Sequence, residues 1–162
     1  MNQRFFLGFE VHQPYRLKKN FKPKLSGNYE DPMERYFDDA NKEILLRVCN
    51  KCYEPATSII LDQLDDGFCC AFSLSGVLIE QMEKWAPDVL ELFNQAARHK
   101  NVEMIGQTYF HSISSLFWTM EEFCNQVNLH RELLKDTFGV EPVIFENTEF
   151  LFDNRIAATV KD

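Results

Sequence analysis

Short apolar runs alternate along the chain with longer segments in which apolar residues recur every three or four positions. The runs cover residues 5–11, 68–74, 102–105 and 141–150, and their length and composition predict β-strands. The segments between them have the spacing of amphipathic helices. Alternating strands and helices predict βα units and a mainly parallel sheet with right-handed crossovers. We therefore expect an α/β fold.

The first apolar run, FFLGFEV at residues 5–11, has the pattern of a strand buried on both faces. Pro14 cannot donate to a sheet ladder, so it closes this strand. Alternation places Glu10 and His12 on the same side. A strand that ends in a histidine is typical of the way α/β barrels present catalytic groups. A core strand that merely ends in a polar loop is the alternative interpretation.

Local signals place the helices between these strands. The residues that carry the signals are capping carboxylates, prolines in first turns and glycines at helix ends. The first helices are predicted from Asp38 or Asp39 to about Tyr53, from Pro55 to Gly67, over 77–84, and over 88–100, which Pro87 precedes. The next helix is predicted from Met120 to about Phe138, with a Thr119–Glu122 capping box at its start and Gly139 at its end. A last helix is predicted from Asp153 onward. Residues 18–37 lack periodicity and predict a long loop after the first strand, beside the site that its polar end would form.

Composition limits the classes of protein to which the chain can belong. With 162 residues, 45% of them hydrophobic and 14% aromatic, it predicts a packed globular protein with one domain. A net charge of −8 argues against nucleic acid or an anionic membrane as partner and suits a neutral ligand such as a sugar. Cys49 and Cys52 form a CxxC inside a helical pattern, which favours buried thiols over a redox or metal site. We see no signal peptide or membrane span and expect a cytoplasmic protein.

Three polar residues stand at the ends of predicted strands: His12, His111 and Glu149. Because the carboxyl ends of parallel strands point the same way, we expect these side chains to meet in one pocket. Continued alternation along the last strand puts Glu149 on one face and Glu146 on the other. A solvated loop glutamate is the simpler interpretation of Glu149 by spacing alone.

Three segments carry a resemblance to a known family. HQPYRL at 12–17, GQTYFHS at 106–112 and ENTEFLFDNRIA at 146–157 resemble, in order, the first three conserved regions of glycoside hydrolase family 57. This is the α-amylase and 4-α-glucanotransferase family, and the resemblance covers essentially the whole chain. It implies an incomplete (β/α) barrel of the seven-stranded type, with residues 1–162 forming about its first half, the N-terminal portion of a single domain.

The resemblance also implies a retaining reaction on α-1,4-glucans or maltooligosaccharides, without cofactor or metal ion. Glu149 would be the nucleophile, and His12 and His111 would contact the sugar in the cleavage subsite. The other substrate-binding candidates are Glu10, Gln13 and Tyr109, and the rings of Tyr15, Tyr36 and Tyr109 can stack on glucose. The family's general acid is an aspartate further along the chain than Asp162, so we expect the isolated chain not to turn over α-glucans. Hydrolysis, glucanotransfer and branching stay open.

Two rival interpretations belong to other classes. A metal-dependent polysaccharide deacetylase is faintly indicated by Asp65-Asp66-Gly67 and His111-Ser112, but Ser115 stands where a second histidine ligand would be needed. A non-catalytic glucan-binding remnant is the other. For the half-barrel that the resemblance implies, an unpaired last strand, around residues 143–150, favours self-association through the sheet edge.

Overall fold

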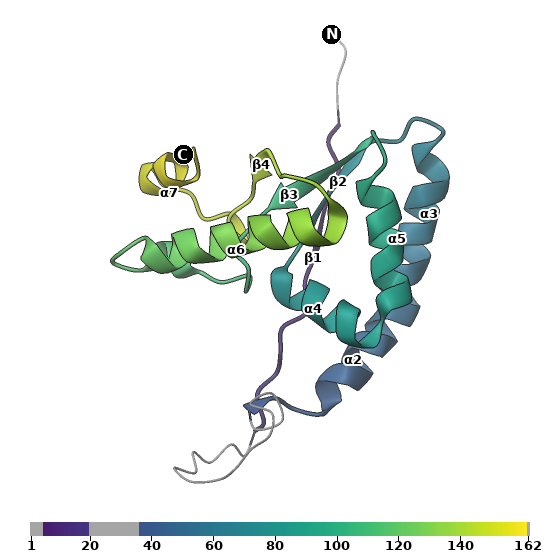
Figure 1. Cartoon of the computed structure of the whole chain (residues 1–162), viewed down its shortest axis with the longest axis horizontal. Helices are drawn as coiled ribbons and strands as arrows, with labels where there is room; N and C mark the ends of the chain where they lie inside the picture. The colour runs from purple at the N-terminus through teal and green to yellow at the C-terminus, as the bar shows by residue number, and fades with distance from the viewer. Residues whose placement is uncertain (1–4, 20–35, 162) are drawn as a thin grey trace.

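A parallel sheet of four strands lies at the centre of the computed structural model, which describes residues 5–19 and 36–161 (Figure 1). The strands lie in chain order: β1 (Gly8–Val11), β2 (Cys70–Leu74), β3 (Val102–Gly106) and β4 (Ile144–Phe145). Each neighbouring pair is parallel. The predicted α/β fold with a parallel sheet is therefore confirmed, and all four strands end at the same edge.

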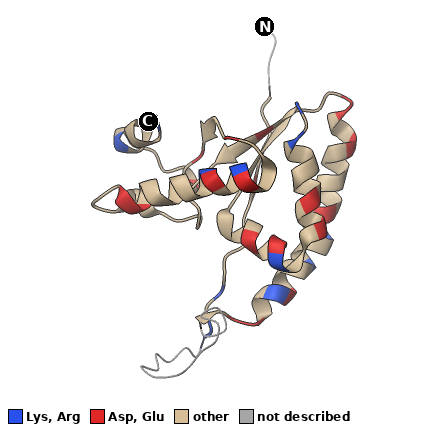
Figure 2. Ribbon diagram, viewed as in Figure 1, with Lys and Arg blue, Asp and Glu red and all other residues tan. Residues whose placement is uncertain are grey.

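Helices connect the strands. They are α2 (Ala40–Val48), the π-helical η1 (Cys49–Tyr53), α3 (Glu54–Leu64), α4 (Gly76–Trp85), α5 (Pro87–Ala97), α6 (Glu121–Phe138) and α7 (Asn154–Lys161), with short 3₁₀ turns η2 (Ser114–Leu116) and η3 (Thr148–Phe150). Helices α3 and α5 lie side by side (Figure 1). Figure 2 shows that acidic residues are spread over the helices together with Lys and Arg, so the helices carry much of the charge.

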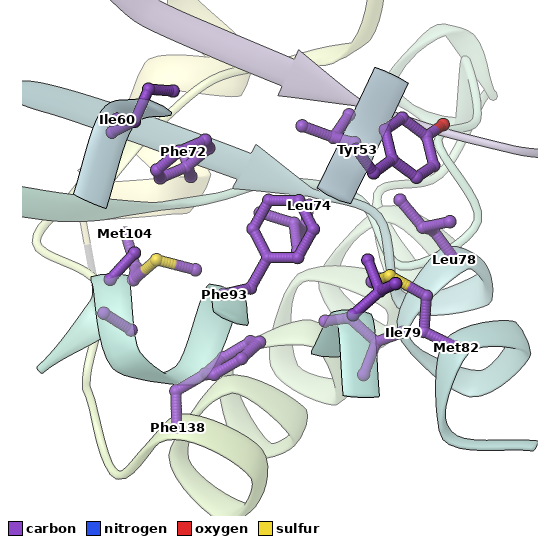
Figure 3. Close-up of a cluster of buried hydrophobic side chains, with 14 of the residues drawn as sticks. Tyr53, Ile60, Phe72, Leu74, Leu78, Ile79, Met82, Phe93, Met104 and Phe138 are labelled. Carbon is purple, nitrogen blue, oxygen red and sulfur yellow. The ribbon is translucent and has the colours of Figure 1, made fainter. Parts of the chain in front are cut away.

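One face of the sheet packs against these helices. Phe72 and Leu74 of β2 and Met104 of β3 point into a cluster of buried side chains from the helical layer, including Phe93 of α5 and Phe138 of α6 (Figure 3). The rings of Phe72 and Phe93 meet edge to face, with centroids 5.5 Å apart. The burial of this apolar area is the main favourable term for folding.

The opposite face of the sheet is more polar near the carboxyl edge. Residues alternate between the two faces of a strand, so Glu10 of β1 and Ser73 of β2, which are register partners, point away from the helices. Gln107 follows β3 and donates its Nε2 hydrogen to Ser73 Oγ at 2.9 Å. This face therefore supplies polar groups to one end of the sheet.

Most predicted helix boundaries are confirmed. Pro55 lies in the first turn of α3, directly after the π-helical segment, and Gly139 ends α6 in the left-handed conformation with φ 71°. Asp153 Oδ1 accepts from the Ile156 N–H at 2.8 Å and so caps α7. The Thr119–Glu122 capping box is wrong, because α6 has Met120 as its N-cap residue without a side-chain cap bond, and Glu122 instead accepts from Gln126 at 2.7 Å.

The first strand is shorter and less buried than its apolar run predicts. It begins at Gly8, and Phe5 is 91% exposed. The reason is its place in the sheet: β1 is an edge strand that pairs on one side only, with β2. The prediction of a strand buried on both faces is therefore wrong, although Val11 is buried.

The fourth strand is also much shorter than predicted. Only Ile144 and Phe145 pair with β3, and the chain then turns into η3, so the alternation that separated Glu146 from Glu149 does not continue. The Asn147 side chain bonds Ser115 Oγ and the Leu151 carbonyl instead. These side-chain bonds satisfy groups in a turn and compete with further strand pairing.

Other predictions have mixed outcomes. Cys49 is buried as predicted, but Cys52 is exposed, and all five thiols are free. Most of the predicted 18–37 loop lies outside the described residues, apart from its ends, where Leu17 and Phe37 form an antiparallel bridge. Within the described ranges, no helix has the length and apolar character needed to cross a membrane.

Candidate functional site

Two histidines meet where β1 and β3 end. The rings of His12 and His111 stack with centroids 4.4 Å apart and an interplanar angle of 29°. Glu10 of β1 reaches the same pair, with its Oε1 atom 2.9 Å from His111 Nε2. The structure thus brings together three of the predicted site residues, from strands far apart in the sequence.

Each ring nitrogen of His111 faces an acceptor. Nε2 faces the Glu10 carboxylate, and Nδ1 lies 3.0 Å from Gln107 Oε1. The Gln107 amide is oriented by the hydrogen that its Nε2 donates to Ser73, which leaves the carbonyl oxygen for His111. The His111 ring is therefore held at both of its nitrogens, by Glu10 on one side and by Gln107 on the other.

His12 is held in a different way. Its Nδ1 lies 2.7 Å from Ser75 Oγ, and its carbonyl oxygen accepts from the Tyr53 hydroxyl at 3.4 Å. Burial, the neighbouring His111 and then Arg16 lower the pKa of His12 from 6.5 to about 4. His12 is therefore a neutral imidazole at neutral pH, able both to donate and to accept a hydrogen bond.

His130 of α6 supports this cluster from within the core. It is fully buried, its Nδ1 accepts from the Gln107 backbone N–H at 3.2 Å, and its Nε2 lies 2.7 Å from the Leu74 carbonyl. The two contacts require the tautomer with hydrogen on Nε2, and burial lowers the pKa of His130, which favours this neutral form. His130 is not among the predicted site residues, because it lies inside helix α6 and so lacks the strand-end position that singled out His12 and His111.

Glu149 lies in the turn η3 after β4. The Thr148 hydroxyl, one residue before it, is 2.9 Å from the Thr108 hydroxyl, which also accepts from the Ser112 N–H at 2.9 Å. These bonds join the turn that carries Glu149 to the turn that carries His111. The Glu149 side chain is exposed, and within the described part of the chain no hydrogen bond, ion pair or ring contact joins it to His12 or His111.

Backbone strain concentrates in these two turns. Among residues 5–19 and 36–161, the non-glycine residues with positive φ are His111 (51°), Glu149 (58°) and Phe150 (54°). The left-handed conformation costs a residue with a Cβ about 1–2 kcal/mol. Strain of this kind persists where the surrounding structure enforces it and is concentrated at functional sites.

Glu146 is electrostatically close to the cluster. Burial and then the neighbouring Glu10 raise its pKa, while His111 opposes the shift. Its backbone N–H donates to the Gly106 carbonyl at 2.9 Å, which fixes it beside the end of β3. Alternation along a longer fourth strand predicts Glu146 on the face opposite Glu149, whereas in the structure Glu146 interacts electrostatically with Glu10 and His111.

The remaining candidates make their contacts outside the histidine pair. Gln13 Oε1 accepts from Arg16 at 3.2 Å, and the Gln13 carbonyl accepts from Gln81 at 2.7 Å. The Tyr109 hydroxyl donates to Glu80 of α4, so this side chain points toward α4. Tyr36 is partly exposed.

The deacetylase hypothesis does not fit this geometry. Asp65 and Asp66 follow α3 and precede β2, so they lie at the opposite edge of the sheet from His111, which follows β3. Across the described ranges, no group of three His, Cys, Asp or Glu side chains is placed to hold a metal ion.

Comparisons with known proteins point to one family. The model of glycosyl hydrolase family 57 matches residues 6–162. A Methanocaldococcus jannaschii protein named "Putative alpha-amylase" is 41% identical over 156 residues, which are 95% of this chain and 32% of that protein. The chain therefore spans about a third of the length of this curated relative.

Solved structures show the same fold at low sequence identity. The 4-α-glucanotransferase from Thermococcus litoralis superposes with a TM-score of 0.70 and 17% identity, covering 96% of this chain and 20% of that one. A peptidoglycan deacetylase from Bacillus subtilis superposes with a TM-score of 0.51 and 16% identity over 66% of this chain and 49% of that one. The deacetylase likeness covers less of the chain and concerns the fold alone.

Proposed function

The chain belongs to glycosyl hydrolase family 57, and we propose that it supplies the sugar-binding and nucleophile part of a retaining site acting on α-1,4-glucans. The observation that carries the proposal is the contact of Glu10, His111 and His12 at the carboxyl edge of the sheet. In parallel α/β folds this edge is where ligands bind. We also propose that the sheet is the first part of an incomplete, seven-stranded barrel.

The histidine pair suits a sugar ligand. Sugar hydroxyls both donate and accept, and the cluster offers both kinds of partner: the neutral imidazole of His12 and the carboxylate of Glu10. The ring stack and the Gln107–Ser73 bond fix both imidazoles before a ligand arrives. Such preorganisation holds the bound sugar in a reactive geometry at little further entropic cost.

Glu149 is the proposed nucleophile. In a retaining reaction its carboxylate oxygen forms a bond to the anomeric carbon while the bond to the leaving oxygen breaks, and a general acid gives that oxygen a proton. Water or another sugar hydroxyl then attacks the glycosyl–enzyme intermediate and releases Glu149. Its exposure and strained turn support this role, because an exposed carboxylate on a constrained backbone can approach a bound sugar.

A fluorinated α-glucosyl fluoride tests the nucleophile directly. Fluoride leaves without protonation, so the reagent does not depend on a general acid, and the ring fluorine slows release of the adduct. We expect one glucosyl adduct on the peptide that contains Glu149, measured by mass spectrometry and suppressed by excess maltohexaose. Glu149→Gln should prevent it.

Glu141→Gln is the matched control, because Glu141 lies on the surface and pairs with Lys135 at 2.7 Å. This variant should be labelled like the parent chain. An adduct on Glu146 or Glu10, or equal labelling of Glu149→Gln, would show that Glu149 is not the nucleophile.

A further inference from the structure

A hollow lies at the same edge of the sheet as the histidine pair. Its volume is about 320 Å³, and its lining residues are Pro14, Tyr15, Phe37, Val77, Glu80 and Phe110. Pro14 and Tyr15 follow shortly after His12, and Phe110 directly precedes His111. The turns that carry the two histidines therefore also supply residues to the wall of the hollow. We propose that this hollow, the aromatic cleft, binds the glucose unit next to the one held by the histidine pair. The inference rests on the function proposed above.

The walls of the aromatic cleft suit the apolar faces of a glucose ring. Phe110 is 50% exposed although it is large and apolar. The Tyr15 ring packs against Phe37, with centroids 5.0 Å apart, and meets Trp85 edge to face at 6.1 Å. Rings braced in this way present contact area to a ligand at low entropic cost.

The polar end of the cleft is built around Glu80. The Tyr109 hydroxyl donates to Glu80 Oε1, and a carboxylate has further acceptor positions for a sugar hydroxyl. Burial and then Glu80 raise the pKa of Tyr15 to about 12, so its hydroxyl keeps its hydrogen at neutral pH. Glu80 and Tyr15 therefore offer one acceptor and one donor beside the aromatic walls.

A close backbone approach holds this polar end in place. A Cβ atom at Gly76 would lie 2.7 Å from the Tyr109 ring, so only glycine lets α4 begin against that ring. The contact fixes Tyr109, and through its hydroxyl it fixes Glu80. A carboxylate at this end favours a neutral sugar over a phosphorylated one, because an anionic ligand would be repelled.

Titration of the full 162-residue chain with maltohexaose, followed by ¹H–¹⁵N NMR, tests the cleft. We expect shift changes at Tyr15 and Phe110 as well as at His12 and His111. Phe110→Ala should weaken binding by about three- to tenfold, the usual effect of losing one stacked ring. Trp118→Ala is the matched control, because Trp118 is fully exposed and outside the cleft, and it should leave the Kd unchanged.

The outcomes separate this inference from the function on which it rests. If Phe110→Ala binds maltohexaose as tightly as the parent chain while His12 and His111 still shift, the cleft is not a subsite and the proposed function stands. A weakening by Trp118→Ala equal to that by Phe110→Ala would also overturn the cleft. If maltohexaose shifts neither pair of residues, both proposals are wrong.

Discussion

At the scale of single residues, His12 links the site to the stability of the fold. Its pKa is about 4 in the folded chain, mainly because of burial, against 6.5 in the unfolded chain. Between these values the unfolded state binds more protons, so the free energy of unfolding falls as the pH falls. The contribution of neutral His12 to the free energy of unfolding is fully present above about pH 6.5 and is lost as the pH falls toward about 4.

We predict that, because of His12, the free energy of unfolding falls by about 1–2 kcal/mol between neutral and mildly acidic pH. This is less than the full pKa shift implies, because the His12 ring is only partly buried. Urea unfolding at both pH values measures it. His12→Asn should show a smaller pH difference, with a remainder in the same direction from His130, whose pKa is also lowered. An unchanged pH difference in His12→Asn would assign the effect to other groups.

Sequence reasoning works well for residues at strand ends and poorly for residues that act from elsewhere. His12 and His111 were predicted to meet because parallel strands end at one edge, and they stack. The groups that orient them, such as Ser75 and Gln107, depend on how neighbouring strands end side by side. No periodicity in the sequence encodes that juxtaposition.

At the scale of elements, His130 joins α6 to the ends of β2 and β3. The ladder between these strands extends from Cys70–Val102 to Phe72–Met104, and beyond it His130 bridges the Leu74 carbonyl and the Gln107 N–H. We predict that His130→Leu lowers the free energy of unfolding by about 2–4 kcal/mol, because it leaves two buried backbone groups unpaired. Urea unfolding measures this loss.

His99→Leu is the control for that prediction. His99 lies at the other end of β3, where it is 3.4 Å from the highly exposed Asp65 and accepts from the Asn101 N–H at 3.2 Å. Exposed ion pairs contribute little to stability, so we expect the free energy of unfolding to fall by less than about 1 kcal/mol. Equal decreases in the free energy of unfolding in the two variants would mean that the His130 bridge between β2 and β3 does not stabilise the fold more than the exposed His99 contacts do.

The elements themselves were largely predictable, and the exceptions have local causes. The helix that ends at Gly139 and the one that begins after Asp153 follow from capping rules that involve only nearby residues. The predicted length of the fourth strand was wrong, because the side chains of Asn147 and Thr148 form hydrogen bonds with distant partners, Ser115 and Thr108. Such tertiary bonds override a local strand pattern.

At the scale of the whole molecule, β4 forms one edge of the sheet within the described residues. Strand β4 pairs with β3 on one side, and Val143 beside it is 84% exposed. Phe150 and Phe152 are also largely exposed nearby. The alternation of strands and helices predicted the parallel sheet, and an open parallel sheet has two edge strands that can pair with another chain.

We predict that the chain self-associates through the β4 edge and that Val143→Lys weakens this association about tenfold, because a charge directly beside an edge strand opposes pairing. Sedimentation velocity over a range of concentrations measures it. Trp118→Lys adds the same charge at a fully exposed site outside β4 and should leave the association unchanged. A parent chain that stays monomeric at all concentrations would disprove the prediction. Equal weakening by both substitutions would instead indicate a general effect of net charge, which at −8 becomes −7 in either variant.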